Sequence, residues 1–149
     1  MLRVSAKVDY AMRALVALAR EAPRPIKGDR LARDEDIPFR FLEVTLGELR
    51  HAGLVRSRRG SEGGYWLARE AQEISMADVM IAIEGSLVDL RAVPPAGDGG
   101  DDPVRSASQV VWERAADDLR TLLSDVSLAD LVDGTLRFER ALDLDPADP

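Results

Sequence analysis

Apolar residues recur every three or four positions along the first third of the chain, which is the spacing of one face of an α-helix. This pattern predicts a helix over residues 5–20 with Ser5 as its N-cap. It also predicts a short helix over about 28–35 and a longer helix that runs to about His51, with Pro38 in its first turn. The residues expected to face inward on the longer helix are Phe41, Leu42, Thr45, Leu46 and Leu49.

The pattern then changes to two short extended runs, over about 54–58 and 64–68. Between them, Gly60, Gly63 and Gly64 supply the positive φ angles that a tight turn needs. The chain thus has a helix, a short helix, a tight turn, a longer helix and a glycine-tipped hairpin. That order is typical of a winged helix-turn-helix domain, in which a helix enters the major groove of DNA and a hairpin lies beside it.

Helical spacing returns in the second half of the chain, after one stretch rich in Pro, Gly and Asp. The sequences SMAD (75–78) and SLAD (127–130) both have the form of a capping box. They predict one helix to about Glu84 and a last helix to about Leu142. A long helix is expected from about Pro103, and one stripe along it holds Ser108, Trp112, Ala115, Leu119, Leu122 and Val126.

The predicted fold is therefore mainly α with a small β-hairpin, divided into four parts. Residues 1–85 form the winged helix-turn-helix domain, and 104–142 hold the long helix and the last helix. Residues 86–103 are expected to be a flexible loop, because their composition leaves little to bury. The tail, 143–149, is expected to be disordered.

Composition and charge narrow the class of protein. No apolar run approaches the roughly 20 residues that span a bilayer, and the N-terminus lacks the apolar segment of a signal peptide, so we expect a cytoplasmic protein. Residues 1–70 hold 14 Lys and Arg against 10 Asp and Glu, a net charge of +4, whereas residues 71–149 hold 6 against 17, a net of -11. A basic half is suited to a polyanion, although ordinary scatter of surface charge explains the same division.

The stretch RSRRGSEGGYWLARE (56–70) sets arginines beside glycines, a combination that suits phosphate. It does not match a nucleotide-binding loop, because no Lys-Ser/Thr pair follows the glycines and no βαβ unit surrounds them. The single histidine, His51, is poor material for acid–base catalysis and is expected to be structural. We therefore do not expect an enzyme. The acidic stretch 98–102 has two interpretations, a Ca²⁺ or Mg²⁺ site or a loop that is simply flexible.

Four segments of the chain resemble the Rrf2 family of transcriptional regulators. They are SAKVDYAMRALVALA (5–19), FRFLEVTLGELRHAGLVRSRRGSEGGYWLARE (39–70), ISMADVMIAIEG (74–85) and VWERAADDLRTLLSDVSLADL (111–131), of which the second is the most specific. The resemblance implies a DNA-binding winged-helix domain, a long helix that pairs with its twin in a homodimer, and control of transcription, usually repression. We expect a homodimeric repressor that binds a pseudo-palindromic operator. The alternative is a winged-helix module that binds a partner protein.

Carried onto this chain, the resemblance assigns residues to DNA and to the dimer. Arg40 is expected to donate to a guanine edge or a phosphate, and Glu43 to accept from a cytosine amino group, unless Glu43 pairs with Arg40 or Arg50. Tyr65 is expected to support the hairpin. The residues expected at the DNA are Lys7, Pro38, Phe39, Arg40, Glu43, Arg56, Arg58, Arg59 and Ser61. Those expected at the dimer interface are Trp112, Ala115, Leu119, Leu122 and Val126, with a domain core or a ligand pocket as the alternatives for Trp112.

The chain departs from the family in its lack of cysteine. Many relatives hold an iron–sulfur cluster on three cysteines before the long helix, whereas LVDLRAVPPAGDGGDDPVRSASQ (87–109) has none. No thiolate-ligated cluster, disulfide or zinc–thiolate site is available, so we expect no cofactor and an effector that is a small molecule or a protein. Gly47 inside the recognition helix costs roughly 1 kcal/mol relative to alanine and predicts a soft helix. Val44 lies near the groove, where it could contact a thymine methyl.

Overall fold

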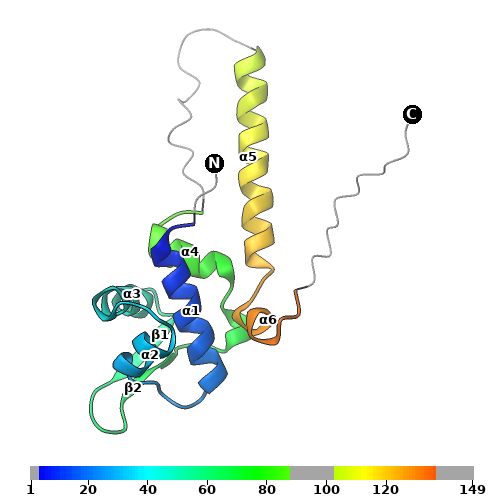
Figure 1. Cartoon of the computed structure of the whole chain (residues 1–149). Coiled ribbons are helices and arrows are strands. Elements are labelled where there is room, and N and C mark those ends of the chain that lie inside the picture. The colour runs from blue at the N-terminus through cyan, green and yellow to red at the C-terminus, as the bar shows by residue number, and fades with distance from the viewer. Residues whose placement is uncertain (1–3, 88–102, 137–149) are drawn as a thin grey trace.

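The computed structural model of the chain describes residues 4–87 and 103–136, and within these ranges it is mainly helical (Figure 1). The acidic stretch 98–102 and the tail 143–149 lie outside the described residues. No helix in the described ranges is long and apolar enough to cross a membrane. In chain order the elements are α1 (Ala6–Glu21), α2 (Gly28–Asp34), α3 (Phe39–His51), β1 (Val55–Arg58), β2 (Gly64–Leu67), η1 (Ala71–Glu73), α4 (Met76–Glu84), α5 (Pro103–Ser124) and α6 (Leu128–Asp133).

Helices α1, α2 and α3 surround one leucine-rich core. Ser5 caps α1 as predicted, because its hydroxyl accepts a hydrogen bond from the Val8 N–H at 3.2 Å. Each leucine buried in the core stabilises the fold by about 2 kcal/mol. The leucines with almost no exposed surface in α1, α2, α3 and the residues up to β1 are Leu15, Leu18, Leu31, Leu42, Leu46, Leu49 and Leu54. Because three of them lie on α3, the core also fixes which face of α3 is left outside.

The buried face of α3 confirms most of the predicted inward residues and corrects one. Phe41 is 64% exposed, and its ring lies 6.5 Å from the ring of Tyr10 on α1, centroid to centroid. Successive residues turn by about 100° around a helix axis, so the position before the buried Leu42 is carried to the edge of the core. The predicted inward residues that are buried are Leu42, Thr45, Leu46 and Leu49.

The hairpin is antiparallel, with Arg58 opposite Gly64, and both strands match the predicted runs within a residue. A Cβ on Gly63 would lie 2.1 Å from the Arg58 carbonyl oxygen, and one on Gly64 would lie 2.6 Å from that of Ile26. No side chain fits at either position. Ile26 and Tyr65 exchange backbone hydrogen bonds of 2.9 and 2.8 Å, which fix the hairpin to the segment before α2.

Helices α4 and α6 start from two capping boxes, as their sequences predicted. In both, the serine hydroxyl accepts from a backbone N–H and the aspartate carboxylate accepts from the serine N–H. The two caps, at Ser75 and Ser127, form an isolated antiparallel bridge, and the Leu128 N–H donates to the Ile74 carbonyl oxygen at 2.9 Å. Leu128 is fully buried in the core around α1, so α6 packs with the winged-helix elements.

The last helix is shorter than predicted. α6 ends at Asp133, because Gly134 adopts a φ of 67° and its N–H bonds to the Asp130 carbonyl oxygen. Residues 137–142 of the predicted helix lie outside the described residues. This is a left-handed C-cap, the same device that ends α4 at Gly85, where the end was predicted.

Helix α5 extends away from the helices around α1, and only part of it packs against them (Figure 1). Ala116 is buried, and Leu123 packs against a small cluster that includes Val8 and Met80. Another side of the helix is exposed and apolar. We call it the outer α5 face, and its members are Val104, Val111, Trp112, Ala115 and Leu122.

The outer α5 face overlaps the predicted dimerisation stripe without matching it. Val126 lies beyond the end of α5 and is 9% exposed, and Leu119 is half-buried. Val104 and Val111, which the predicted stripe omits, are 74% and 62% exposed. The surface open to a partner is therefore shifted toward the start of α5.

Candidate nucleic-acid interface

The N-terminal end of α3 is open to solvent. Pro38 was predicted in the first turn of α3, whereas it is the N-cap, directly before that turn. It is exposed together with Phe39, Arg40 and Glu43. Among the described residues no side chain caps this helix, and its first turn holds no acidic residue. The free N–H groups and the helix dipole give this end a partial positive charge, which suits a phosphate or a base edge.

Arg40 and Glu43 have no hydrogen-bond or ion-pair partner within the described part of the chain. The ion pair considered between Glu43 and either Arg40 or Arg50 does not form there. Instead, Arg50 Nη1 donates to Ser57 Oγ of β1 at 3.1 Å and joins α3 to the hairpin. The donor of Arg40 and the acceptor of Glu43 are both available to bases.

The hairpin presents its arginines to solvent. Arg56, Arg58 and Arg59 are exposed, as is Ser61 in the turn. Arg58 Nη2 donates to the Glu62 carbonyl oxygen at 3.1 Å, whereas Arg56 and Arg59 have no partner in the ranges 4–87 and 103–136. Arg59, directly after β1, is therefore a cation with no internal bond to break before it binds a phosphate.

Two contacts join the hairpin to the start of α2. Lys27 Nζ donates a hydrogen bond to the Gly60 carbonyl oxygen in the turn. The Tyr65 ring lies 3.3 Å from the position of a Cβ on Gly28, so a larger residue there would press on the ring. This contact explains the glycine at the start of α2. It also confirms that Tyr65 supports the hairpin.

Lys7, expected at a phosphate, forms an ion pair inside the chain. Its Nζ lies 2.7 Å from Glu48 Oε1 and links α1 to α3, and the two side chains are 39% and 37% exposed. A pair this exposed contributes well under about 1 kcal/mol after solvent screening. The predicted contact of Lys7 with a phosphate would require it to leave Glu48, whose Oε2 is buried without a partner among the described residues.

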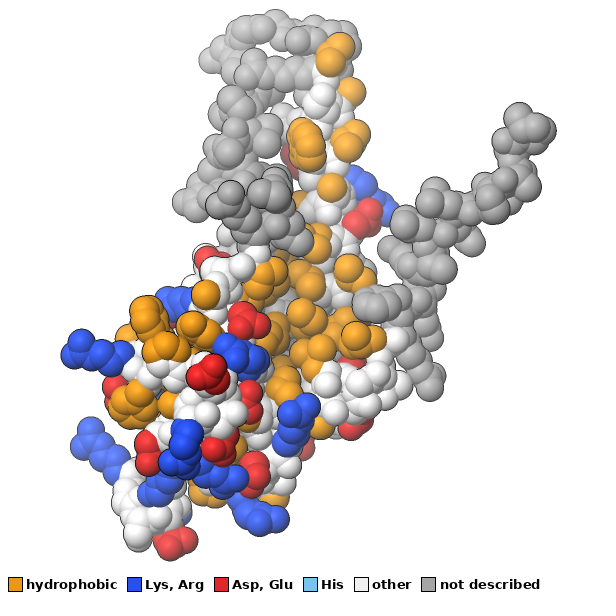
Figure 2. Space-filling view, viewed as in Figure 1, with side chains coloured by type: hydrophobic (Ala, Val, Ile, Leu, Met, Phe, Trp, Pro, Cys, Tyr) orange, Lys and Arg blue, Asp and Glu red, His pale blue; other side chains and the backbone are white. Residues whose placement is uncertain are grey.

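Figure 2 shows how charged and apolar side chains lie on this face of the molecule. Lys and Arg side chains gather over the part that holds α2, α3 and the hairpin, where Asp, Glu and hydrophobic side chains lie among them, and further hydrophobic side chains run along α5. Cations on the surface near α3 and the hairpin suit a polyanion.

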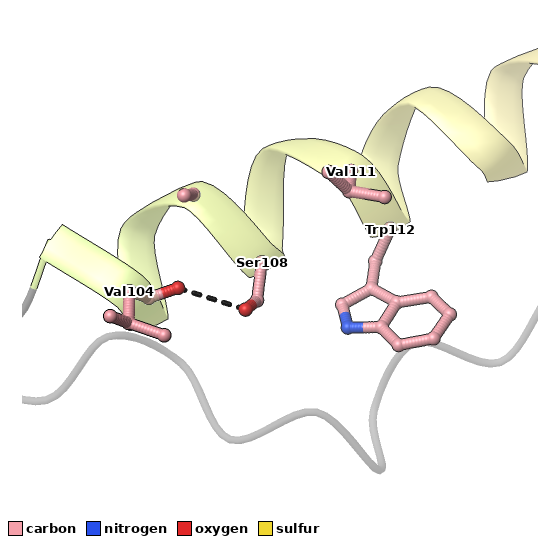
Figure 3. A pocket seen from close by; sticks show the side chains of 5 residues that line it. Val104, Ser108, Val111 and Trp112 are labelled. Atoms are coloured by element: carbon pink, nitrogen blue, oxygen red, sulfur yellow. Dashed lines mark hydrogen bonds between the residues drawn. The ribbon is translucent and has the colours of Figure 1, made fainter.

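A second exposed feature lies on α5. A shallow hollow is lined by Val104, Ala107, Ser108, Val111 and Trp112. Val104, Ser108 and Trp112 project from the same side of the helix, and Ser108 Oγ donates to the Val104 carbonyl oxygen at 2.8 Å (Figure 3). Trp112 is 54% exposed, which excludes the interpretation that it belongs to the domain core of the single chain.

The donor groups of this chain do not fit an iron–sulfur cluster. The sequence has no cysteine and a single histidine. Within the described ranges, no group of three His, Cys, Asp or Glu side chains is placed to hold a metal ion. Cluster iron needs thiolates or, in some centres, paired histidines, and the chain supplies neither.

Comparison with known proteins gives a family match over most of the chain. A model of the Rrf2 family, described as an iron-dependent transcriptional regulator, matches residues 4–134. The protein Rv1287 of Mycobacterium tuberculosis, whose name describes an HTH-type transcriptional regulator, is 43% identical over 136 residues, which are 91% of this chain and 84% of that protein. The HTH-type transcriptional regulator IscR of Photorhabdus laumondii is 33% identical over 134 residues, which are 88% and 79% of the two chains.

Solved structures share the fold. CymR, the global cysteine regulator of B. subtilis, superposes with a TM-score of 0.74 at 29% identity, covering 91% of this chain and all of that one (100%). IscR of T. potens superposes with a TM-score of 0.71 at 30% identity, covering 94% and 93%. The mainly helical fold with a two-stranded hairpin is thus confirmed.

Proposed function

This chain belongs to the Rrf2 family of transcriptional regulators, and on that premise we propose that it is a homodimeric repressor that binds a pseudo-palindromic operator through α3 and the hairpin. Its homologues are regulators and not enzymes, and they imply DNA as the partner. A regulator acts where the DNA lies, so we propose a cytoplasmic location.

The observation that carries the proposal is the pair of unpartnered arginines on two linked elements. Among the described residues, Arg40 on α3 and Arg59 on the hairpin have no internal partner, and the Arg50–Ser57 hydrogen bond holds the two elements together. Phosphate contacts by such groups position a protein on DNA, while base contacts specify the sequence. We assign Arg59 to the first role and Arg40 and Glu43 to the second.

The outer α5 face supports the homodimer. Apolar surface exposed to water is unfavourable by about 25 cal/mol per Å², and a second copy would cover it with the same residues about a two-fold axis. Two copies then present two α3 helices to two half-sites, so the operator should repeat the symmetry of the dimer.

The family is described as iron-dependent, but we propose that this chain holds no iron–sulfur cluster, because it has no cysteine. We propose DNA binding without metal or reductant, with a small molecule or a protein as effector. Anaerobically purified protein should be colourless. An absorbance band in the visible region of that protein would overturn the cluster-free proposal.

Selection of genomic fragments by the purified chain tests the function and supplies the operator. Arg59→Ala should weaken binding to every sequence by about tenfold and reduce its salt dependence by about one phosphate contact. Glu43→Ala should instead relax the preference for one base pair in each half-site. Arg114→Ala is the matched control, since it removes one exposed arginine on α5, paired there with Asp118. Unchanged binding by both test variants, or enrichment of no sequence, would contradict the proposal.

A further inference from the structure

We propose that Val44 and Gly47, at the middle of α3, form a contact site for a thymine methyl group in each half-site. The proposal rests on the function above and names part of the sequence that α3 recognises. It concerns the face of α3 opposite the buried leucines, which carries Arg40, Val44, Gly47 and His51 at helical spacing.

Gly47 has no function inside the described chain that explains a glycine. Among the glycines of residues 4–87 and 103–136, it alone has an ordinary negative φ and open space around the position of a Cβ. Gly28 and Gly63 make room for neighbouring atoms, and the remaining glycines adopt positive φ. An alanine would fit at position 47 and would favour the helix.

Contact with another molecule would explain why position 47 holds a glycine. Lack of a side chain lets the backbone approach another molecule closely, which is a general use of glycine at binding surfaces. Gly47 lies on the exposed side of the helix that the fold directs away from the core. The surface that approaches it would be the edge of the base pairs.

Val44 defines the chemistry of that surface. Its side chain is 58% exposed and can neither donate nor accept a hydrogen bond. A base edge of donors and acceptors would lose its hydrogen bonds to water on meeting it. The C5-methyl of thymine is the apolar group of the major groove, so it is the partner that suits Val44.

The two residues act together because they lie three positions apart, on adjacent turns of one face. Gly47 allows the helix to approach the groove, and Val44 then touches the methyl. Arg40 and Glu43 lie nearer the start of the helix and provide the hydrogen bonds. We therefore expect an invariant thymine in each half-site, next to the base pairs that Arg40 and Glu43 contact.

The test uses the consensus duplex obtained by selection from a random DNA library with the wild-type chain. Each thymine is replaced by deoxyuridine, which removes the methyl and leaves the hydrogen-bonding groups unchanged. At one position per half-site, binding should weaken about fourfold, the equivalent of about 0.8 kcal/mol of buried methyl, and about fifteenfold when both half-sites are changed. In Val44→Ala, which keeps only the Cβ, the same replacement should have a clearly smaller effect. Val110→Ala, which shortens an exposed valine on α5, should retain the full effect.

Gly47→Ala provides a second test, in which thermal stability should rise and affinity for DNA should fall. Thermal unfolding should occur at a higher temperature, because the added Cβ has space and favours the helix. Affinity for the consensus duplex should fall at least about fivefold, because the methyl group enters a packed interface.

The outcomes separate this inference from the proposed function. If no sequence is enriched, both fail. If a consensus is found but deoxyuridine has no effect at any position, or retains its full effect in Val44→Ala, the methyl contact is wrong and the repressor proposal stands. Unchanged affinity in Gly47→Ala would likewise overturn the close approach.

Discussion

Two exposed surfaces differ in what lies behind them: the outer α5 face, and the end of the molecule that holds α3 and the hairpin. We call the latter the DNA-facing end because we propose that it binds DNA. Helix α3 rests on a closed leucine core, and hydrogen bonds from Arg50 and Lys27 hold the hairpin beside it. The outer α5 face consists of apolar side chains that the chain itself leaves in contact with water. Under the proposed function, one chain supplies the whole of the DNA-facing end, whereas a second copy would cover the outer α5 face.

The largest effect should come from a charge placed on the outer α5 face. We expect Val111→Asp to be monomeric, because a buried aspartate without a partner is strongly disfavoured at an interface. A monomer binds one half-site at a time, so operator affinity should fall by about 100-fold or more. Sedimentation velocity measures the mass, and fluorescence anisotropy with the operator duplex measures the affinity.

The neighbouring valine provides the control for this variant. Val110 is 64% exposed but lies about 100° around the helix from Val111, away from the outer α5 face. Val110→Asp changes the same residue type in the same turn and should remain dimeric. Equal dissociation of both variants, or of neither, would show that the interface lies elsewhere.

The second prediction concerns α6, which packs against the core of the winged-helix elements. Leu128 at the start of α6 is fully buried, so Leu128→Ala should lower the free energy of unfolding by about 2–5 kcal/mol. Urea denaturation, followed by a spectroscopic signal of the winged-helix elements, measures this free energy. Leu136, 46% exposed after α6, is the control, and Leu136→Ala should change this free energy by less than about 0.5 kcal/mol. Similar values for the two would mean that α6 is not part of the core in solution.

Local chemistry made the elements of the winged helix predictable from the sequence. Ser5, the SMAD and SLAD boxes and Gly85 each specify a helix end through bonds to adjacent residues, and each end lies where it was predicted. Gly134 carries the same signal as Gly85, and α6 ends there, before the predicted end. Of the three hairpin glycines predicted to adopt positive φ, Gly60 and Gly64 do so. Gly63 does not, and its glycine is explained instead by the Arg58 carbonyl oxygen, which leaves no room for a Cβ.

Features that depend on distant residues were predicted less well. Helical periodicity predicts which side of α3 faces inward but not how wide the buried face is. That width depends on where α1 lies, and Phe41 is therefore at its edge, near Tyr10. The sequence does not reveal the ion pair of Lys7 with Glu48, which is 41 positions away and 2.7 Å distant, and the predicted contact of Lys7 with DNA stays a prediction. The shift of the outer α5 face toward Val104 accompanies the burial of Ala116 and the packing of Leu123 against the cluster that includes Val8 and Met80, and no local pattern shows it.

The smallest expected effect concerns the cap that attaches α6 to the winged-helix side of the molecule. The pKa of Asp130 is lowered from its ordinary value of 3.8, because the Ser127 hydroxyl and the Ser127 N–H both donate to its carboxylate. A lowered pKa in the folded state means that the unfolded chain binds the proton more readily. The cap therefore adds stability above about pH 3.8 and loses it as the pH falls through the lower folded value.

Asp130→Asn should remove this acid-dependent part. Between about pH 5 and about pH 3, the melting temperature of the wild type should fall more steeply than that of Asp130→Asn, because the asparagine has no proton to take up. Asp125→Asn removes the same charge at a side chain that accepts no hydrogen bond from the described residues, and it should keep the wild-type slope. Dimer mass and operator affinity at neutral pH should not change in either variant, since the cap lies on neither the DNA-facing end nor the outer α5 face. Parallel melting curves for Asp130→Asn and the wild type would mean that the two Ser127 hydrogen bonds are not kept in solution.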